Sequence, residues 1–99
     1  MSQDSVKVAP KIARVLFEND RIRIVEIKLK KRQKMEMHSH PANAVYAITR
    51  SRIKSTSPDG KAKKLKMKKG QVNWSDGGSH AVENLDKKAA LSLVIELKK

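Results

Sequence analysis

Cysteine and aromatic residues are scarce in this sequence: it has no cysteine, and only three of its 99 residues are aromatic. Without cysteine, disulfides and thiolate metal sites are excluded, so a metal would need histidine, carboxylate or main-chain ligands. No run of about 18 or more apolar residues occurs, and the first ten residues lack the apolar core of a secretory signal. We therefore expect a cytoplasmic protein that does not span a membrane.

Acidic residues are also few, since 10 Asp and Glu stand against 23 Lys and Arg, which gives a net charge of +13. Such an excess attracts anions and keeps a protein in solution. Six lysines lie within residues 61–69 and could contact phosphates. The few aromatic residues provide no stacking platform for single strands, and no predicted helix could enter a major groove. We expect a small anionic molecule as the partner, and not a nucleic acid.

A chain of this length forms one domain with a modest core, which buries roughly 60–65% of the surface that the unfolded chain exposes. Association of two copies through an apolar sheet face would add the burial that one copy lacks. We therefore expect a homodimer.

Helical periodicity is almost absent, and short alternating segments separated by turn residues predict an all-β chain. Ser57-Pro58-Asp59-Gly60 predicts a hairpin turn, because Pro58 sets φ and Gly60 permits the reversal. About nine short antiparallel strands predict a single sandwich or barrel over residues 11–99, after a flexible arm at 1–10. The predicted strands cover residues 12–17, 21–30, 35–40, 43–49, 52–56, 61–67, 71–75, 79–85 and 89–97.

Two predicted strands have informative patterns. In residues 21–30 the apolar positions begin at Ile22 and Ile24 and then change parity to Val25, Ile27 and Leu29. Either a β-bulge or burial of both faces would explain the change. In residues 35–40 strict alternation would place Met35, Met37 and Ser39 opposite Glu36, His38 and His40.

The chain has only three histidines, and their placement predicts one metal site. His38 and His40 lie two apart on a predicted strand, so their side chains point to the same face. Two neutral imidazoles on one face form a chelate that suits Zn, Fe, Ni or Cu. His80 is distant in sequence but follows the Gly77-Gly78 corner, which could aim it inward.

The histidine spacing resembles the small single-domain members of the cupin superfamily. Their first motif, G-x5-H-x-H-x3,4-E-x6-G, is matched here by His38-Ser39-His40. Their second motif, G-x5-P-x-G-x2-H-x3-N, is matched in a version one residue shorter before the histidine, running from Gly70 through His80 to Asn84. The resemblance covers roughly residues 12–98.

The departures from the motifs concern the site directly. The position of the metal-binding Glu holds Ala44, or Val45 in the longer spacing, and neither side chain can ligate. Ser51 stands for the last glycine of the first motif and Asp76 for the proline of the second. The three histidine positions are all filled, so the chain is identified as a divergent cupin whose site lacks the usual Glu.

The resemblance implies a jelly-roll-like β-barrel with a divalent transition metal (Fe, Zn, Ni, Cu or Mn) on His38, His40 and His80. Family chemistries include dioxygenation, isomerisation, lyase reactions and metal binding without catalysis. The sequence leaves open whether the chain is an enzyme, and histidines that persist without a metal are the alternative. By strand parity, Ala44, Tyr46 and Trp74 are expected to line the pocket, with Tyr46 as the candidate acid.

Overall fold

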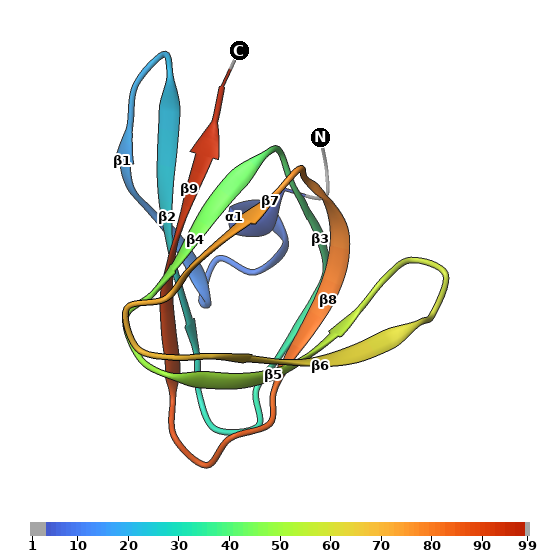
Figure 1. Cartoon of the computed structure of the whole chain (residues 1–99). Coiled ribbons are helices and arrows are strands. Elements are labelled where there is room, and N and C mark those ends of the chain that lie inside the picture. The colour runs from blue at the N-terminus through green and yellow to red at the C-terminus, as the bar shows by residue number, and fades with distance from the viewer. Residues whose placement is uncertain (1–3, 99) are drawn as a thin grey trace.

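The computed structural model describes residues 4–98, which form nine strands and one short helix (Figure 1). In chain order they are α1 (Ser5–Val8), β1 (Ala13–Glu18), β2 (Ile22–Leu29), β3 (Lys34–His40), β4 (Asn43–Ala47), β5 (Ser51–Thr56), β6 (Ala62–Met67), β7 (Val72–Ser75), β8 (Gly78–Asn84) and β9 (Ala90–Leu97). The strands pair antiparallel in two sheets, one ordered β1-β2-β9-β4-β7 and the other β3-β8-β5-β6. The predicted all-β architecture is confirmed.

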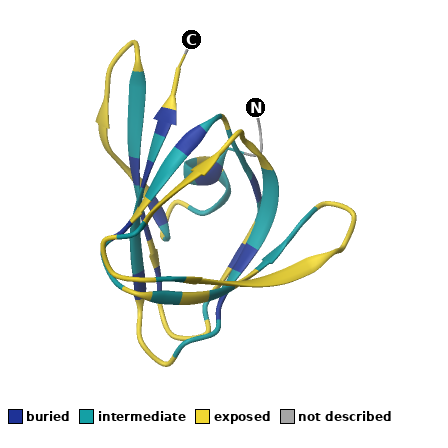
Figure 2. Cartoon of the chain, in the orientation of Figure 1, coloured by how far each residue is buried: buried dark blue, intermediate teal, exposed yellow. Residues whose placement is uncertain are grey.

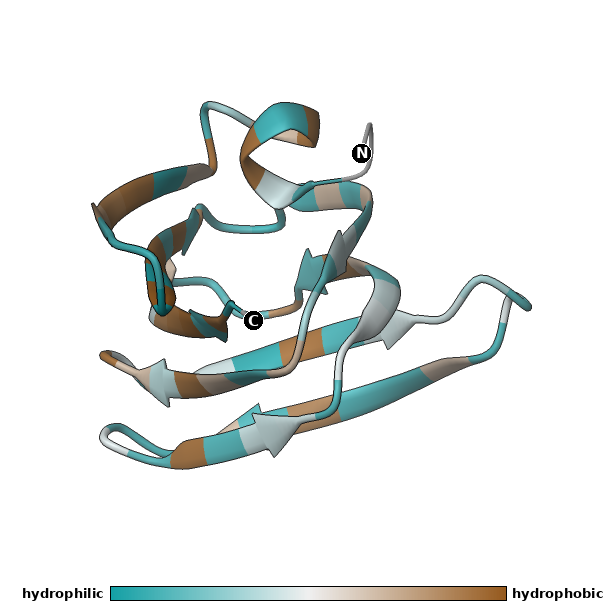
Figure 3. Ribbon diagram, turned by 90° about the horizontal axis from the view of Figure 1, so that it is seen from above, coloured by the Kyte–Doolittle hydropathy of each residue, from teal (hydrophilic) through white to brown (hydrophobic). Residues whose placement is uncertain are grey.

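The core lies between the two sheets, and its buried residues come from β1, β2, β3, β8 and β9. Val25, Ile27 and Leu29 of β2 point inward beside Val94 of β9, and Met35 of β3 packs against them. Figure 3 shows hydrophobic and hydrophilic residues alternating along several strands, as expected where one sheet face is buried.

The change of parity in residues 21–30 arises because β2 carries apolar side chains on both faces. The pairing of β2 with β9 continues without a shift, with Val25 opposite Val94 and Ile24 opposite Ile95. Val25 belongs to the core, so Ile24 points to the outer face of the five-stranded sheet. A register shift does occur here, but it lies on β1, between Val15 and Phe17.

Strand β3 contains a bulge that changes which residues face the core. Met35 pairs with Val82 and His38 pairs with His80, so two residues of β3 oppose one residue of β8. Met35 and His38 are 1% and 0% exposed, so both point inward although they are three positions apart. The predicted strict alternation over residues 35–40 is therefore wrong, because the bulge resets the parity at Glu36–Met37.

The turn at Ser57–Gly60 joins β5 to β6 as predicted. The Gly60 amide donates to the carbonyl of Ser57, and Gly60 has a φ of +87°. L-residues with a side chain rarely adopt that conformation, which accounts for glycine at this position. Within residues 4–98, no helix is long and apolar enough to cross a membrane.

The N-terminal segment differs from the flexible arm that the sequence suggested for residues 1–10. From Asp4 onward it is docked: Ser5 is fully buried, and Val6 and Ala9 pack against the core. Asp4 forms a β-bridge with Ser39 of β3 and caps α1 by accepting from the amide of Val6. Apolar burial and this polar anchoring hold residues 4–9 in place, while residues 1–3 lie outside the described part of the chain.

Candidate metal centre

The paired strands β3 and β8 bring the three histidines together. His38 lies directly opposite His80 in the strand register, and His40 follows two residues along the same face of β3. The ring centroids are 4.7 Å apart for His38 and His80, 4.9 Å for His38 and His40, and 5.7 Å for His40 and His80. One nitrogen from each ring lies within 4.8 Å of the others, close enough to hold one metal ion.

The Gly77-Gly78 corner sets the start of β8 beside the histidine-bearing strand. Gly78 pairs with His40, and Gly77 has a φ of +104°. A Cβ at position 77 would lie 2.9 Å from the carbonyl oxygen of His40 and 3.1 Å from the carbonyl carbon of Pro41. Glycine therefore allows the close backbone approach that places His80 across from His38.

The hydrogen bonding of His38 shows whether the site fits a metal. Its Nδ1 lies 2.7 Å from the carbonyl oxygen of Glu36 in the bulge, and a carbonyl can only accept, so Nδ1 carries the proton. Nε2 then holds a lone pair, and it is buried without a hydrogen-bond partner. Buried polar atoms are normally satisfied, so this orphaned acceptor fits a metal ligand.

The other two rings are also held through Nδ1. His80 Nδ1 lies 3.3 Å from the Ser55 hydroxyl, and His40 Nδ1 lies 2.7 Å from Oε2 of Glu96. Contacts on Nδ1 leave Nε2 of each ring for coordination, which is the usual outer arrangement around metal-bound histidines.

Burial favours the uncharged form of His38 and His80. Burial lowers the pKa of His38 below its ordinary value. Burial, followed by the charges of His38 and His40, lowers the pKa of His80 to about 4. Neutral imidazole is the form that binds a metal, so neither ring has to lose a proton near neutral pH.

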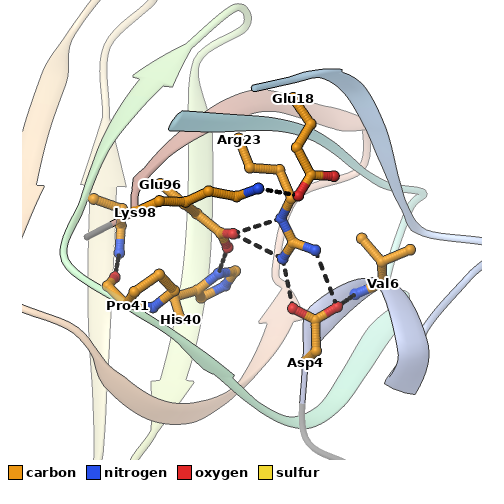
Figure 4. Close-up of polar contacts among 9 residues, drawn as sticks. Asp4, Val6, Glu18, Arg23, His40, Pro41, Glu96 and Lys98 are labelled. Carbon is orange, nitrogen blue, oxygen red and sulfur yellow. Dashed lines mark hydrogen bonds and ion pairs between the residues drawn. The ribbon is translucent and has the colours of Figure 1, made fainter. Parts of the chain in front are cut away.

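Behind His40 lies a buried ion-pair network that the sequence analysis did not identify (Figure 4). Glu96 of β9 is 2% exposed and accepts from Arg23 Nε at 2.8 Å while it contacts His40. Arg23 in turn pairs with Asp4. The sequence pattern could have indicated this residue, because Glu96 shares the inward parity of Val94 and is the only charged residue of β9.

The predicted pocket residues Ala44, Tyr46 and Trp74 do not face the histidines. In β4 the inward positions are Asn43, which is buried, and Val45, which packs against the core. Ala44 and Tyr46 alternate with them and point outward, and Trp74 pairs with Ala44 on β7. Tyr46 and Trp74 are 40% and 57% exposed, so all three belong to the outer face of the five-stranded sheet. Of the two positions considered for the family's Glu, Val45 is the one that points inward.

Comparisons with known proteins identify the fold. No family model and no curated protein sequence matches the chain. A cupin domain from Bordetella pertussis matches with a TM-score of 0.82 at 21% identity, over 89% of this chain and 93% of that chain. A protein with a double-stranded β-helix domain from Klebsiella pneumoniae matches with a TM-score of 0.68 at 18% identity, over 89% and 84% of the two chains.

A cupin family protein from Methanocaldococcus jannaschii, also a double-stranded β-helix, matches with a TM-score of 0.69 at 15% identity, over 88% and 79% of the two chains. These similarities agree with the two-sheet antiparallel topology. The chain therefore has the cupin fold, the double-stranded β-helix that these solved proteins share.

Proposed function

We propose that this chain binds one divalent transition metal, Fe, Zn, Ni, Cu or Mn, through Nε2 of His38, His40 and His80. The observation that carries the proposal is the buried, unpartnered Nε2 of His38 beside two other histidine rings. Burial lowers the pKa of His38 and of His80, which supports the proposal because neutral rings accept a metal without first releasing protons.

We further propose that the site takes a small anionic molecule. Three neutral ligands leave the full charge of a divalent ion in place, and they leave coordination positions open. When bound, such an ion supplies Lewis acidity that favours carboxylate, enolate or thiolate ligands. The net charge of +13 attracts anions toward the protein as a whole.

Two functions share this site: a metal-dependent reaction of the dioxygenase, isomerase or lyase type, and metal or ligand binding without catalysis. Tyr46, the candidate acid, lies on the outer face of β4 and so provides no proton donor beside the histidines. Of the two functions, we therefore favour metal or ligand binding without catalysis. Turnover of any member of a panel of thiols, diketones and hydroxy acids by the metal-loaded protein would instead establish the catalytic function.

The metal proposal is tested by elemental analysis of the purified protein after growth in metal-replete medium. We expect about one ion per chain in the wild type and loss of most of it in His38→Ala and His80→Ala. Tyr46→Ala serves as the control, since it also removes a ring but from the outer face, and it should retain the metal. A wild type without stoichiometric metal would contradict the proposal, and the identity of a bound ion would narrow the chemistry.

A further inference from the structure

Glu96 is the one acidic residue among the buried side chains of residues 4–98. It lies on β9 between outward-facing apolar residues, and its side chain is 3% exposed. Its two carboxylate oxygens have different partners: Oε1 accepts from Arg23, while Oε2 contacts Nδ1 of His40. A buried carboxylate needs such partners to offset the cost of leaving water.

We propose that Glu96 is a positioning residue for the metal centre, which rests on the metal-binding function proposed above. Its carboxylate holds His40 as the tautomer protonated on Nδ1, and therefore directs the Nε2 lone pair of His40 toward His38 and His80. The Nδ1–Oε2 distance of 2.7 Å is typical of a charge-assisted hydrogen bond.

Arg23 fixes the carboxylate for this task. Its guanidinium contacts Oε1 of Glu96 through Nε at 2.8 Å and through a terminal nitrogen at 2.7 Å. Asp4 holds the same guanidinium from the other side, so a salt-bridge chain runs from the N-terminal segment to His40 (Figure 4). Because the guanidinium of Arg23 is held by Asp4 as well as by Glu96, the Glu96 carboxylate has little freedom to turn away from His40.

The network of Asp4, Arg23 and Glu96 carries a net charge that can be compared with that of the Glu ligand missing from this chain. Two carboxylates and one guanidinium, from Asp4, Glu96 and Arg23, leave one net negative charge behind His40. A Glu ligand, as in the family motif, would place one negative charge directly on a metal. Glu96 thus places a negative charge behind the imidazole of His40, while the three ligands themselves stay neutral.

The experiment compares wild type with Glu96→Gln, using Glu26→Gln as the matched control. Glu26 also forms an ion pair with an arginine on a neighbouring strand, Arg14 at 2.8 Å, but it lies away from the histidines on the surface. The first readout is the ¹⁵N spectrum of the histidine rings in the metal-free protein, which reports the tautomer directly. The second is the dissociation constant for Zn²⁺ from competition with a chelator.

In wild type and in Glu26→Gln we expect His40 as the Nδ1–H tautomer. In Glu96→Gln we expect a mixture, because an amide can either accept from Nδ1 or donate to it. Zn²⁺ affinity should fall by about 10- to 100-fold in Glu96→Gln alone.

An Nε2–H tautomer of His40 in the wild type would overturn the proposal without any variant, even if Glu96→Gln failed to fold. An unchanged tautomer and an unchanged affinity in a folded Glu96→Gln would also overturn it. If the tautomer shifts in Glu96→Gln but wild type binds no metal, the positioning role stands and the metal-binding function fails.

Discussion

Gly77 and Gly78 are adjacent residues that both adopt positive φ, at +104° and +132°, but their surroundings differ. A side chain at Gly77 would collide with the backbone of His40 and Pro41, whereas one at Gly78 would meet nothing within 4 Å. A side chain at either position would strain the backbone, but only one at Gly77 would also collide with the histidine-bearing strand. Comparing substitutions at the two positions therefore distinguishes the two effects.

We expect Gly77→Ala to destabilise the protein by about 2 kcal/mol more than Gly78→Ala, because the backbone of His40 must move as well. Urea unfolding of both variants measures the difference. Gly77→Ala should also weaken Zn²⁺ binding, since the displaced strand carries a ligand. Equal losses of stability in the two variants would show that the close approach at Gly77 has no energetic role.

Buried polar side chains in this protein fall into two groups. Asn84 is fully buried and satisfied: its amide donates to the carbonyls of Leu29, Lys30 and Lys88, and its oxygen accepts from the Asp86 amide. Over residues 4–98, the hydroxyl of Ser5 and Nε2 of His38 are the buried side-chain atoms left without a partner. The first pattern indicates a structural role. Of the two unpartnered atoms, Nε2 of His38 lies beside two other histidine rings, as the proposed metal site requires.

At the scale of the elements, the bulge in β3 lets one strand contribute both to the core and to the candidate metal centre. Met35 fills the core, and three residues later His38 faces the same interior. The carbonyl of Glu36 within the bulge then orients the ring of His38. One local irregularity therefore resets the parity of the strand and fixes a tautomer.

The outer face of the five-stranded sheet is apolar over β9, β4 and β7. Leu93, Ile95, Tyr46, Val72 and Trp74 share this face by their register, and Val72 and Trp74 are 60% and 57% exposed. Figure 2 shows β7 exposed along its length. These positions carry none of the cations that dominate the rest of the sequence, so a second, equally positive copy could approach here without repulsion between facing lysines.

We predict that this face forms the homodimer contact. Trp74→Lys should convert a dimer to a monomer, because it places a charge in the centre of an apolar contact. Light scattering after size-exclusion chromatography gives the mass directly. Leu65→Lys, a change of the same kind on β6 of the other sheet, should leave the dimer intact. A monomeric wild type at high concentration would contradict the prediction.

At the scale of the whole molecule, charge is distributed unevenly over the two sheets. On β5 and β6, Lys54 lies opposite Lys64 and Arg52 opposite Lys66, and like charges in such cross-strand pairs repel each other. Figure 2 shows β6 and the β5–β6 turn exposed to solvent. One sheet therefore presents a basic outer surface on β5 and β6, while the other presents an apolar one over β9, β4 and β7.

Stability of the metal-free protein should depend on pH through the buried histidines. The folded chain lowers the pKa of His80 from 6.5 to about 4, and that of His38 falls in the same direction. Between these pH values the unfolded chain binds more protons, so the free energy of unfolding decreases as the pH falls from 6.5 towards 4. We expect a loss of about 2 kcal/mol, after a discount for solvent screening at the partly exposed His80.

Urea titrations in the presence of a chelator, at about pH 7 and about pH 4.5, measure this loss. His80→Asn provides the comparison, because it removes one of the two titrating groups and should reduce the dependence on pH. A wild type that is equally stable at both pH values would show that His80 keeps an ordinary pKa in the fold.

The sequence by itself determined the strands, the turns and the identity of the clustered histidines. Alternation and turn residues are local properties, so the nine strand positions could be predicted to within one or two residues over most of the chain. The His38–His40 spacing and the resemblance of the region around His80 to the cupin motif identified three residues that the structure brings together.

Only the tertiary structure decided which side chains share the interior. Tyr46 and Trp74 could not be assigned to a face from parity, because both faces of the five-stranded sheet are apolar. The bulge in β3 depends on pairing with β8 at His80, and the proposed role of Glu96 depends on a side-chain contact with His40 in the other sheet. Both partners are more than 40 residues away in sequence. Such long-range contacts are fixed by packing of the complete fold, and they determine here how His40 and His80 are held.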